Sequence, residues 1–396
     1  MTLAIIGGGI GGLALAAGLH NLGIKVHVFE RARSFKPLGA GLGLGSNAML
    51  ALDRMGVKED VAKVGMPLQE QRFLNDKLDV MNRIDFSLLK KRFGEETVTI
   101  HRADLHEALF RAVEPDYFHF DKQVTDFVQH DDHVTLTFQD NTTYEVDYVI
   151  AADGIHSIFR QTLLPDSRPR YAGYTCWRGI TKNKGDVMPH ISSEAWSAHG
   201  RFGWAPLHDG NVYWFACVNA DEGDHYYARL DKGKTARLFA HFSSTVERLI
   251  RETEDAFFLH HDIYDMQPLD SFVYGRVCLL GDAAHATTPN MGQGAGQAIE
   301  DAYELMRAIN EETSISRALS RYDAKRVKKA KKVIKLSRQI GRAAQWQHPL
   351  LIGFRNTVFP FIEYCIHFAC IPIRISKYRV PIYSKIVAFS QADVFV

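Results

Sequence analysis

The chain has 396 residues, of which 46% are hydrophobic and 23% are charged, and its formal net charge is +1. This length favours two domains over one simple core. The near-neutral charge excludes a general attraction to nucleic acid or to an anionic membrane. Neither is therefore an expected partner, and a monomer or a homodimer is equally compatible with the sequence.

The cysteines indicate a reduced, cytoplasmic setting. The five of them form no Cys-x-x-Cys pair and no regular framework. Cys365 and Cys370 are spaced as a redox disulfide could be, but two apolar cysteines on a buried helix are the favoured interpretation. The longest apolar stretch, residues 358–373, contains two prolines, Glu363 and His367, and it is too short and broken to span a bilayer.

The first 30 residues predict one βαβ unit of a parallel sheet. Residues 3–6 are a short apolar run typical of a buried strand, and residues 25–30 predict a second strand. Between them, residues 13–22 are rich in Ala and Leu and predict a helix that ends at Gly23. The glycine-rich turn joins the first strand to this helix.

The spacing of Gly7, Gly9 and Gly12, with Glu30 eighteen residues further on, is typical of dinucleotide binding. The first glycine permits the tight turn, the second lets a pyrophosphate approach the backbone, and the third lets the helix pack on the strand. The helix N-terminus offers free N–H groups to the phosphates. Glu30 can accept both hydroxyls of an adenosine ribose. The alternative is a glycine-rich turn that serves only close packing.

Further elements follow from periodicity. Helices are predicted at residues 47–55 and 102–113, and strands at 98–100, 148–152 and 277–280. Residues 118–149 alternate and predict an antiparallel hairpin. Residues 171–274 are rich in strand-forming and aromatic residues and predict a second, mainly antiparallel sheet.

The fold class is therefore α/β. A Rossmann-like dinucleotide-binding domain with a parallel sheet is joined to a mainly antiparallel substrate domain and a C-terminal helical segment. We expect the first domain to be discontinuous, over residues 1–75, 101–170 and 276–345. The substrate domain takes residues 76–100 and 171–275, and the helical segment takes 346–396. That last segment could cap the core, mediate dimerisation or rest against a membrane.

Two charged stretches have competing interpretations. Residues 325–342 form a basic helix, for which a solvated face is favoured over an anionic membrane or partner surface. His260, His261 and Asp262 resemble metal ligands. Adjacent residues of a strand point to opposite faces, however, so no metal site is expected there.

A further stretch gathers Asp282, His285 and glycines at a strand-to-helix junction. By itself this stretch is compatible with an acid/base pair, a metal site or a cradle for a ligand.

Three motifs occur in order: "GGGIGG" with Glu30, "DYVIAADGIHSIFR" at residues 147–160, and "GDAAHATTPNMGQGAGQAIEDA" at residues 281–302. Together they resemble the FAD-dependent aromatic hydroxylases, the single-component flavoprotein monooxygenases that include salicylate, para-hydroxybenzoate and urate hydroxylases. The resemblance extends to about residue 345.

The resemblance implies a set of FAD-binding residues. Glu30, with Arg31 beside it, would lie at the adenosine ribose, Arg102 near the phosphates and the ribityl chain, and Asp282 on the ribityl chain. Asp153 and Gly154 match a motif associated with both FAD and the nicotinamide. Backbone contacts would come from Gly7, Gly9, Gly11, Gly12, Gly43, Val124, Gly292, Gly294, Ala295 and Gly296. The last four would place N–H groups near the flavin ring, with His285 structural. Arg102 could instead be a surface residue at a helix start.

The implied reaction uses NADH or NADPH to reduce FAD, and then O₂ to hydroxylate a small aromatic or heteroaromatic substrate through a C4a-hydroperoxyflavin. Arg201 and Tyr213 match active-site positions, the first to pair with an anionic substrate and the second to orient its ring. Each also has a structural alternative, an edge-strand surface charge for Arg201 and a core aromatic for Tyr213. Urate-type enzymes have an acidic residue after the proline of the third motif, whereas Asn290 follows Pro289 here.

Two other classes of function stay open at this point. One is a flavin enzyme that does not hydroxylate, such as a reductase, a saturase or a drug-inactivating relative. The other is a non-catalytic FAD-binding protein attached to a membrane or a partner through its basic helix and apolar C-terminal segment.

Overall fold

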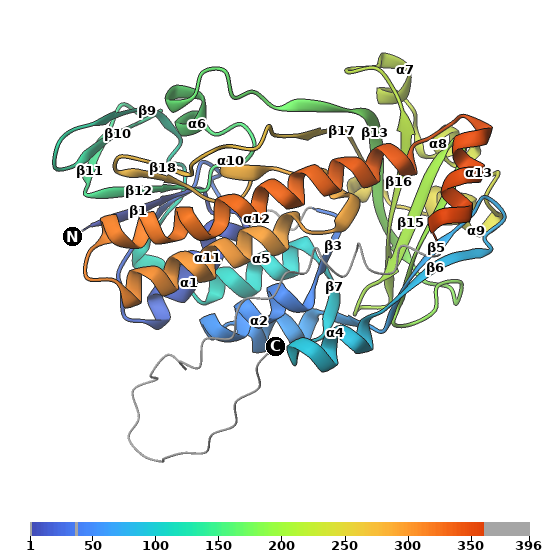
Figure 1. Ribbon diagram of the computed structural model, residues 1–396, viewed down its shortest axis with the longest axis horizontal. Coiled ribbons are helices and arrows are strands. Elements are labelled where there is room, and N and C mark those ends of the chain that lie inside the picture. Colours follow the sequence, from blue (N-terminus) through green and yellow to red (C-terminus); the bar gives the residue numbers. More distant parts are fainter. Residues whose placement is uncertain (1, 36–38, 360–396) are drawn as a thin grey trace, which may run out of the picture.

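The computed structural model describes residues 2–35 and 39–359. Its first sheet has six strands in the order β18-β19-β12-β1-β2-β8 (Figure 1). All neighbours in it are parallel except β18 and β19. The strands are β1 (Leu3–Ile6), β2 (His27–Phe29), β8 (Phe118–His119), β12 (Tyr148–Ala151), β18 (Val273–Tyr274) and β19 (Val277–Leu279).

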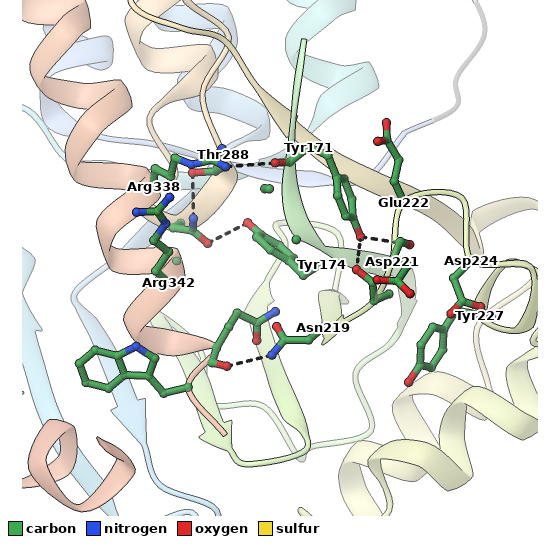
Figure 2. A pocket seen from close by; sticks show the side chains of 17 residues that line it. Tyr171, Tyr174, Asn219, Asp221, Glu222, Asp224, Tyr227, Thr288, Arg338 and Arg342 are labelled. Atoms are coloured by element: carbon green, nitrogen blue, oxygen red, sulfur yellow. Dashed lines mark hydrogen bonds between the residues drawn. The ribbon is translucent and has the colours of Figure 1, made fainter. Parts of the chain in front are cut away.

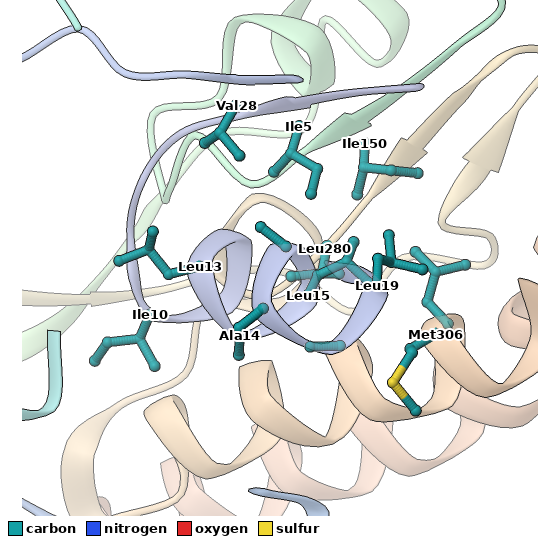
Figure 3. Packing of buried hydrophobic residues seen from close by; sticks show 14 of the residues in the cluster. Ile5, Ile10, Leu13, Ala14, Leu15, Leu19, Val28, Ile150, Leu280 and Met306 are labelled. Atoms are coloured by element: carbon teal, nitrogen blue, oxygen red, sulfur yellow. The ribbon is translucent and has the colours of Figure 1, made fainter. Parts of the chain in front are cut away.

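The helix that follows β1 is α1 (Ile10–Asn21), and it is buried over most of its circumference. One side packs on the parallel sheet and another on α11 (Gly294–Glu311), as Figure 3 shows for Leu13, Leu15 and Met306. A helix enclosed in this way has no polar face, which explains its run of Ala and Leu. The predicted βαβ unit is confirmed, with the helix beginning three residues earlier than expected.

The second sheet has seven strands in the order β17-β13-β16-β15-β14-β5-β6, and only β14 and β5 are parallel. The predicted, mainly antiparallel sheet is thus confirmed. Its strands are β5 (Glu70–Leu74), β6 (Val80–Asp85), β13 (Arg170–Lys182), β14 (Ile191–Ser197), β15 (Gly200–Pro206), β16 (Asn211–Asn219) and β17 (Leu259–Asp265).

One face of this sheet forms its own hydrophobic core. Trp177, Phe202 and Trp214 project from that face and pack with Phe239 and Leu249 of the helices that cover it. The covering helices are α7 (His225–Ala228), α8 (Lys232–Phe239) and α9 (Ser244–Arg251), with η2 (Asp255–Phe257) after them. We call this the outer face, and the opposite one, which looks toward the six-stranded sheet, the inner face.

Two three-stranded sheets complete the strands, in the orders β11-β10-β9 and β3-β7-β4. The first contains the expected antiparallel hairpin. Two strands cross the expected domain limits, because β5 joins the seven-stranded sheet and β7 pairs with β3. The strands are β3 (Gly41–Leu44), β4 (Met66–Leu68), β7 (Thr97–His101), β9 (Val124–Gln129), β10 (Val134–Phe138) and β11 (Thr143–Val146).

The remaining helices surround the parallel sheet and cross to the second one. α12 lies along α11 and runs toward the seven-stranded sheet, where α13 follows it (Figure 1). Residues 360–396, with Cys365 and Cys370, lie outside the described part of the chain. These helices are α2 (Ser46–Met55), α3 (Lys58–Val64), α4 (Phe86–Phe93), α5 (Arg102–Arg111), η1 (Pro115–Tyr117), α6 (Ile158–Leu163), α10 (Asp282–His285), η3 (Pro289–Met291), α12 (Ile315–Ala344) and α13 (Pro349–Val358).

The basic helix is not simply solvated, and the expectation of a solvated face is wrong at its N-terminal end. Arg326 is 2% exposed, and its guanidinium bonds Asp301 and, at 2.8 Å, Glu300. Both carboxylates belong to α11 and are fully buried. Lys329 also pairs with Glu300, and His285 lies 2.5 Å from Asp301. These five residues form what we call the buried charge cluster.

Replacing Arg326 with Ala leaves two buried carboxylates without their main cation. We expect the free energy of unfolding to fall by about 3–5 kcal/mol, the usual cost of removing one partner from a buried ion pair. Chemical denaturation measures it. The matched control is Lys328→Ala, an exposed position on the same helix, which should change stability by no more than about 0.5 kcal/mol. Equal effects from both substitutions would contradict a structural role for the cluster.

The cluster also predicts a dependence of stability on pH. Burial opposes ionisation of Asp301, but His285 and Arg326 outweigh it, so the pKa of Asp301 is lowered. A lowered carboxylate pKa contributes stability above the unfolded value of about 3.9, and this contribution is lost as pH falls below it. The difference in Tm between the wild type and Asp301→Asn should therefore be largest at neutral pH and shrink on acidification below about pH 4. A difference that grows with acid would contradict this.

Candidate active site

The glycine turn after β1 combines tight packing with an open side. Gly7 has φ +105°, and a Cβ there would lie 2.5 Å from the carbonyl oxygen of Ala152. A Cβ on Gly12 would lie 2.1 Å from the oxygen of Gly7. At Gly9, the residue before α1, a Cβ would meet nothing within 4 Å. The turn therefore leaves free space beside a helix N-terminus, where a phosphate is favoured.

Gly11 faces away from this space. A Cβ on it would lie 2.7 Å from Cδ2 of Leu280 and 3.2 Å from Cβ of Ala298 in α11. The structure therefore gives Gly11 a packing role between two helices. Its expected contact with a cofactor would have to come from the backbone alone.

The polar residues around the turn are partly preorganised. The half-buried carboxylate of Glu30 accepts the N–H groups of Gly8 and Ala32 at 2.7 and 2.8 Å, which holds it at the turn. Arg31 and Arg102 are exposed. Sequence reasoning missed His106, whose Nε2 lies 2.6 Å from the carbonyl oxygen of Gly8. Its position four residues after Arg102, on the same side of α5, is the signal that could have indicated it.

The second motif follows β12. Oδ2 of Asp153 accepts the N–H of Ile158 at 2.9 Å, whereas Oδ1 is buried without a partner among the described residues. Burial raises the pKa of Asp153. Gly154 has φ +85°, and a Cβ on it would meet no atom within 4 Å. A Cβ on Gly43 of β3 would also meet none. Val124 begins β9 and is buried.

The third motif follows β19 and bears on the three interpretations of residues 281–296. Asp282 is exposed, whereas His285 is buried on Asp301, so the two do not form an acid/base pair. His285 is structural, as expected. Gly292 has φ +61°, and neither it nor Gly294 has an atom near its missing side chain, whereas a Cβ on Gly296 would touch Ala48 at 3.6 Å. No side chain caps the N-terminus of α11, beside Ala295, so its N–H groups are available to a ligand.

These motifs converge because β1, β12 and β19 are adjacent parallel strands. Their carboxyl ends lie at one edge of the sheet, where ligands of open α/β sheets bind. His260 is separate from this edge, and its Nε2 lies 2.6 Å from Oγ1 of Thr175. Among residues 2–35 and 39–359, no cluster of three His, Cys, Asp or Glu side chains could hold a metal.

The inner face of the seven-stranded sheet carries both residues expected at the substrate. Tyr213 of β16 packs on β3, where a Cβ on Gly41 would lie 2.5 Å from its side chain. Arg201 of β15 is 2% exposed, and its Nη1 donates to Oε1 of Glu194 at 3.0 Å. Arg201 is therefore not an edge-strand surface charge. It is a buried cation whose charge Glu194 already neutralises.

Asn290 joins this face to the third motif. Its Oδ1 accepts from Nη2 of Arg201 and, at 3.1 Å, from the hydroxyl of Tyr174. Its Nδ2 donates to Oγ1 of Thr288 at 2.8 Å and to the carbonyl oxygen of Ser337 at 2.9 Å. The guanidinium of Arg201 also lies over the ring of Tyr174, at 5.1 Å. Every polar atom of the Asn290 amide thus has partners, which fixes its orientation.

A cavity of about 930 Å³ is lined by Tyr174, which is labelled in Figure 2, and by Asn290. Arg338 and Arg342 of α12 line one side of it, and Asp221 and Glu222 after β16 line the other. Tyr174 and Asn290 are therefore shared between this cavity and the surroundings of Arg201.

Comparison with known proteins identifies the class. Residues 1–337 match the family described as the FAD binding domain, and the chain belongs to that family. It is 37% identical over 358 residues to an aurachin C monooxygenase/isomerase of Stigmatella aurantiaca, covering 90% of this chain and 93% of that one. It is 32% identical over 346 residues to an FAD-dependent urate hydroxylase of Klebsiella oxytoca, covering 86% and 89%.

The fold agrees with these relatives. The structure of Klebsiella pneumoniae HpxO with FAD and uric acid matches with a TM-score of 0.85 at 28% identity, covering 93% of this chain and 96% of that one. The protein is therefore an FAD-dependent monooxygenase. Its residues fit FAD, because the open glycines leave room for the dinucleotide and the buried, unpartnered Oδ1 of Asp153 can accept a hydrogen bond from it.

Gly9→Val tests this site. The space beside Gly9 is empty of protein atoms, so the side chain should enter the phosphate site and leave the fold intact. We expect FAD affinity to fall at least about tenfold, since the loss of one hydrogen bond to a charged group costs about 1.5–3 kcal/mol. Flavin absorbance per protein measures retention.

The control is Gly353→Val, where a Cβ also meets nothing within 4 Å but the position lies on α13. Flavin content should then match the wild type. A Gly9→Val protein with normal flavin content would show that no phosphate approaches this turn.

Proposed function

We propose that the protein hydroxylates a small aromatic or heteroaromatic molecule bound between the FAD site and the inner face of the seven-stranded sheet. In this reaction NAD(P)H and O₂ are consumed, one oxygen atom enters the substrate and the other leaves as water. The observation that carries the proposal is the position of Tyr213. Its side chain projects from the inner face onto Gly41 of β3, two residues before the open Gly43 on the same strand.

Bound FAD supplies the electron transfer and the activation of O₂. The chain's own residues bind the cofactor and the substrate and orient them. The turn at Gly9 and the N-terminus of α11 present N–H groups, which favour negative charge on a ligand by about 0.3–2 kcal/mol each. Burial raises the pKa of Tyr213, so its hydroxyl stays protonated at neutral pH and can donate to a substrate oxygen. The aromatic side chains of the inner face limit the access of water.

Asn290 supports a substrate other than urate. A neutral amide stands where urate-type enzymes carry an acid, and its Oδ1 is engaged by Arg201 and Tyr174. A carboxylate here would place a second negative charge beside Arg201, together with Glu194. The charge of the site therefore differs from the urate-type pattern, and with it the preferred substrate.

The other classes of function receive less support. A non-catalytic FAD-binding protein does not fit the monooxygenase relatives. Anchoring through the basic helix is weakened because Arg326 and Lys329 are committed to the buried charge cluster. Within the described ranges, no helix combines the length and apolarity needed to cross a bilayer. A cytoplasmic location and the choice between monomer and homodimer stay predictions.

The test is NAD(P)H oxidation by the holoenzyme with a panel of phenols, purines and bicyclic heteroaromatics. We expect at least one phenol or bicyclic compound to stimulate oxidation and to yield a product heavier by one oxygen atom, as measured by mass spectrometry. Incorporation of ¹⁸O from ¹⁸O₂ identifies the source of the oxygen. Stimulated oxidation that yields only hydrogen peroxide with every compound, or urate as the sole hydroxylated member, would contradict the proposal.

A further inference from the structure

Arg178 and Arg201 of the inner face differ in their partners. Arg201 is buried against Glu194 and Asn290. Arg178 of β13 is half-buried, and no carboxylate of the described residues forms an ion pair with it. A cation held away from bulk water without a partner is costly, unless another group supplies negative charge. Arg178 is therefore the cation on this face that remains available to a ligand.

The position of Arg178 is fixed by the register of three strands. It stands opposite Phe215 of β16 on one side and Leu259 of β17 on the other. Tyr213 precedes Phe215 by two residues, so its side chain projects from the same face of β16. These four residues are all half-buried, unlike Arg201 and Cys217 next to them. A cation, two aromatic rings and an aliphatic side chain thus form one partly accessible patch.

We infer that Arg178 binds the anionic oxygen of the aromatic substrate, while Phe215 and Tyr213 contact its ring. This inference rests on the proposed function and names the substrate class, an aromatic carboxylate or phenolate. The planar guanidinium can bond such an oxygen with two N–H groups. Arg201 then acts as a positioning residue, because it holds Asn290 and Tyr174 in place while its own charge is balanced by Glu194.

Arg178 hydrogen-bonds the thiol of Cys176, two residues before it on the same face. The hydrogen bond with Cys217 and the positive charge of Arg178 lower the pKa of Cys176, against the effect of burial. In the free protein Arg178 therefore contacts a thiol and not a carboxylate, and a bound anion can offset its charge.

The experiment compares ligands of nearly equal shape that differ in charge. Benzoate with benzamide, 4-hydroxybenzoate with 4-hydroxybenzamide, and quinoline-2-carboxylate with its carboxamide are titrated into the holoenzyme. The change in flavin absorbance gives each Kd without requiring turnover. We expect the wild type to prefer the anionic member of at least one pair. Arg178→Gln should weaken that anion about 10- to 100-fold, the size of a lost charged hydrogen bond, and change the neutral ligand less than about threefold.

Two further variants keep this test independent of folding. Arg178→Lys retains the charge and should restore a part of the preference for the anion. Arg237→Gln removes an exposed arginine from α8, on the outer face, and should leave every Kd unchanged. Flavin content and Tm are measured for each variant, and a normal flavin content identifies a folded protein.

The following results would overturn the inference. One is that Arg178→Gln weakens the binding of the anionic and neutral ligands equally. Another is that Arg201→Gln alone abolishes the preference for the anionic ligand. The wild type could also fail to bind any anionic member or prefer the neutral ones. Failure of the proposed function is distinguishable from all of these. In that case the anions would bind and depend on Arg178, yet no aromatic compound would be hydroxylated.

Discussion

The structure depends on the ion pairs between Arg326 of α12 and the acids Glu300 and Asp301 of α11. Two carboxylates and a guanidinium are removed from water together, which is tolerable only when every charge and hydrogen bond is satisfied. The surroundings meet this condition. Asp301 also accepts the N–H of Gly281, and Asn47 of α2 bonds Glu300. The same residues therefore fix the glycine turn after β19, the direction of α11 and the position of α2, which together border one side of the proposed FAD site.

The helix that supplies Arg326 also reaches the substrate face. Eleven residues further along α12, Ser337 bonds Thr288 and holds the amide of Asn290, and Arg338 pairs with Asp265 at the end of β17. Asp265 is fully buried and is also paired with Arg170 of β13. One continuous helix thus connects the buried charge cluster to the seven-stranded sheet. Because a hydrogen-bonded helix is stiff along its axis, α12 sets the distance between the proposed FAD site and the inner face.

Sequence patterns predicted the parts of the molecule that depend on local periodicity. The strand at residues 3–6, the helix after Gly9, the hairpin and the second sheet all carry their signal within a few residues. The partners of charged residues carry no such signal. Arg326 looked like one cation among many in a basic helix, because its acids lie in another helix and only packing brings them together. Arg201 and Glu194 lie on adjacent strands, and neither the alternation of β14 nor that of β15 says which charges meet across them. Arg178 was missed for the same reason, since the absence of a partner is a property of the fold.

The charges of the inner face connect these points to specificity. Arg178 and Arg201 contribute two positive charges, Glu194 contributes one negative charge, and Asn290 contributes none, which leaves one positive charge uncompensated beside the aromatic patch. An acid at position 290 would cancel it. The single exchange of a carboxylate for an amide therefore changes the ligand charge that the face favours, without moving a strand or a ring. The exchange also changes the hydrogen bonds, because the amide nitrogen of Asn290 donates to Thr288 and to the carbonyl oxygen of Ser337, which an ionised carboxylate cannot do.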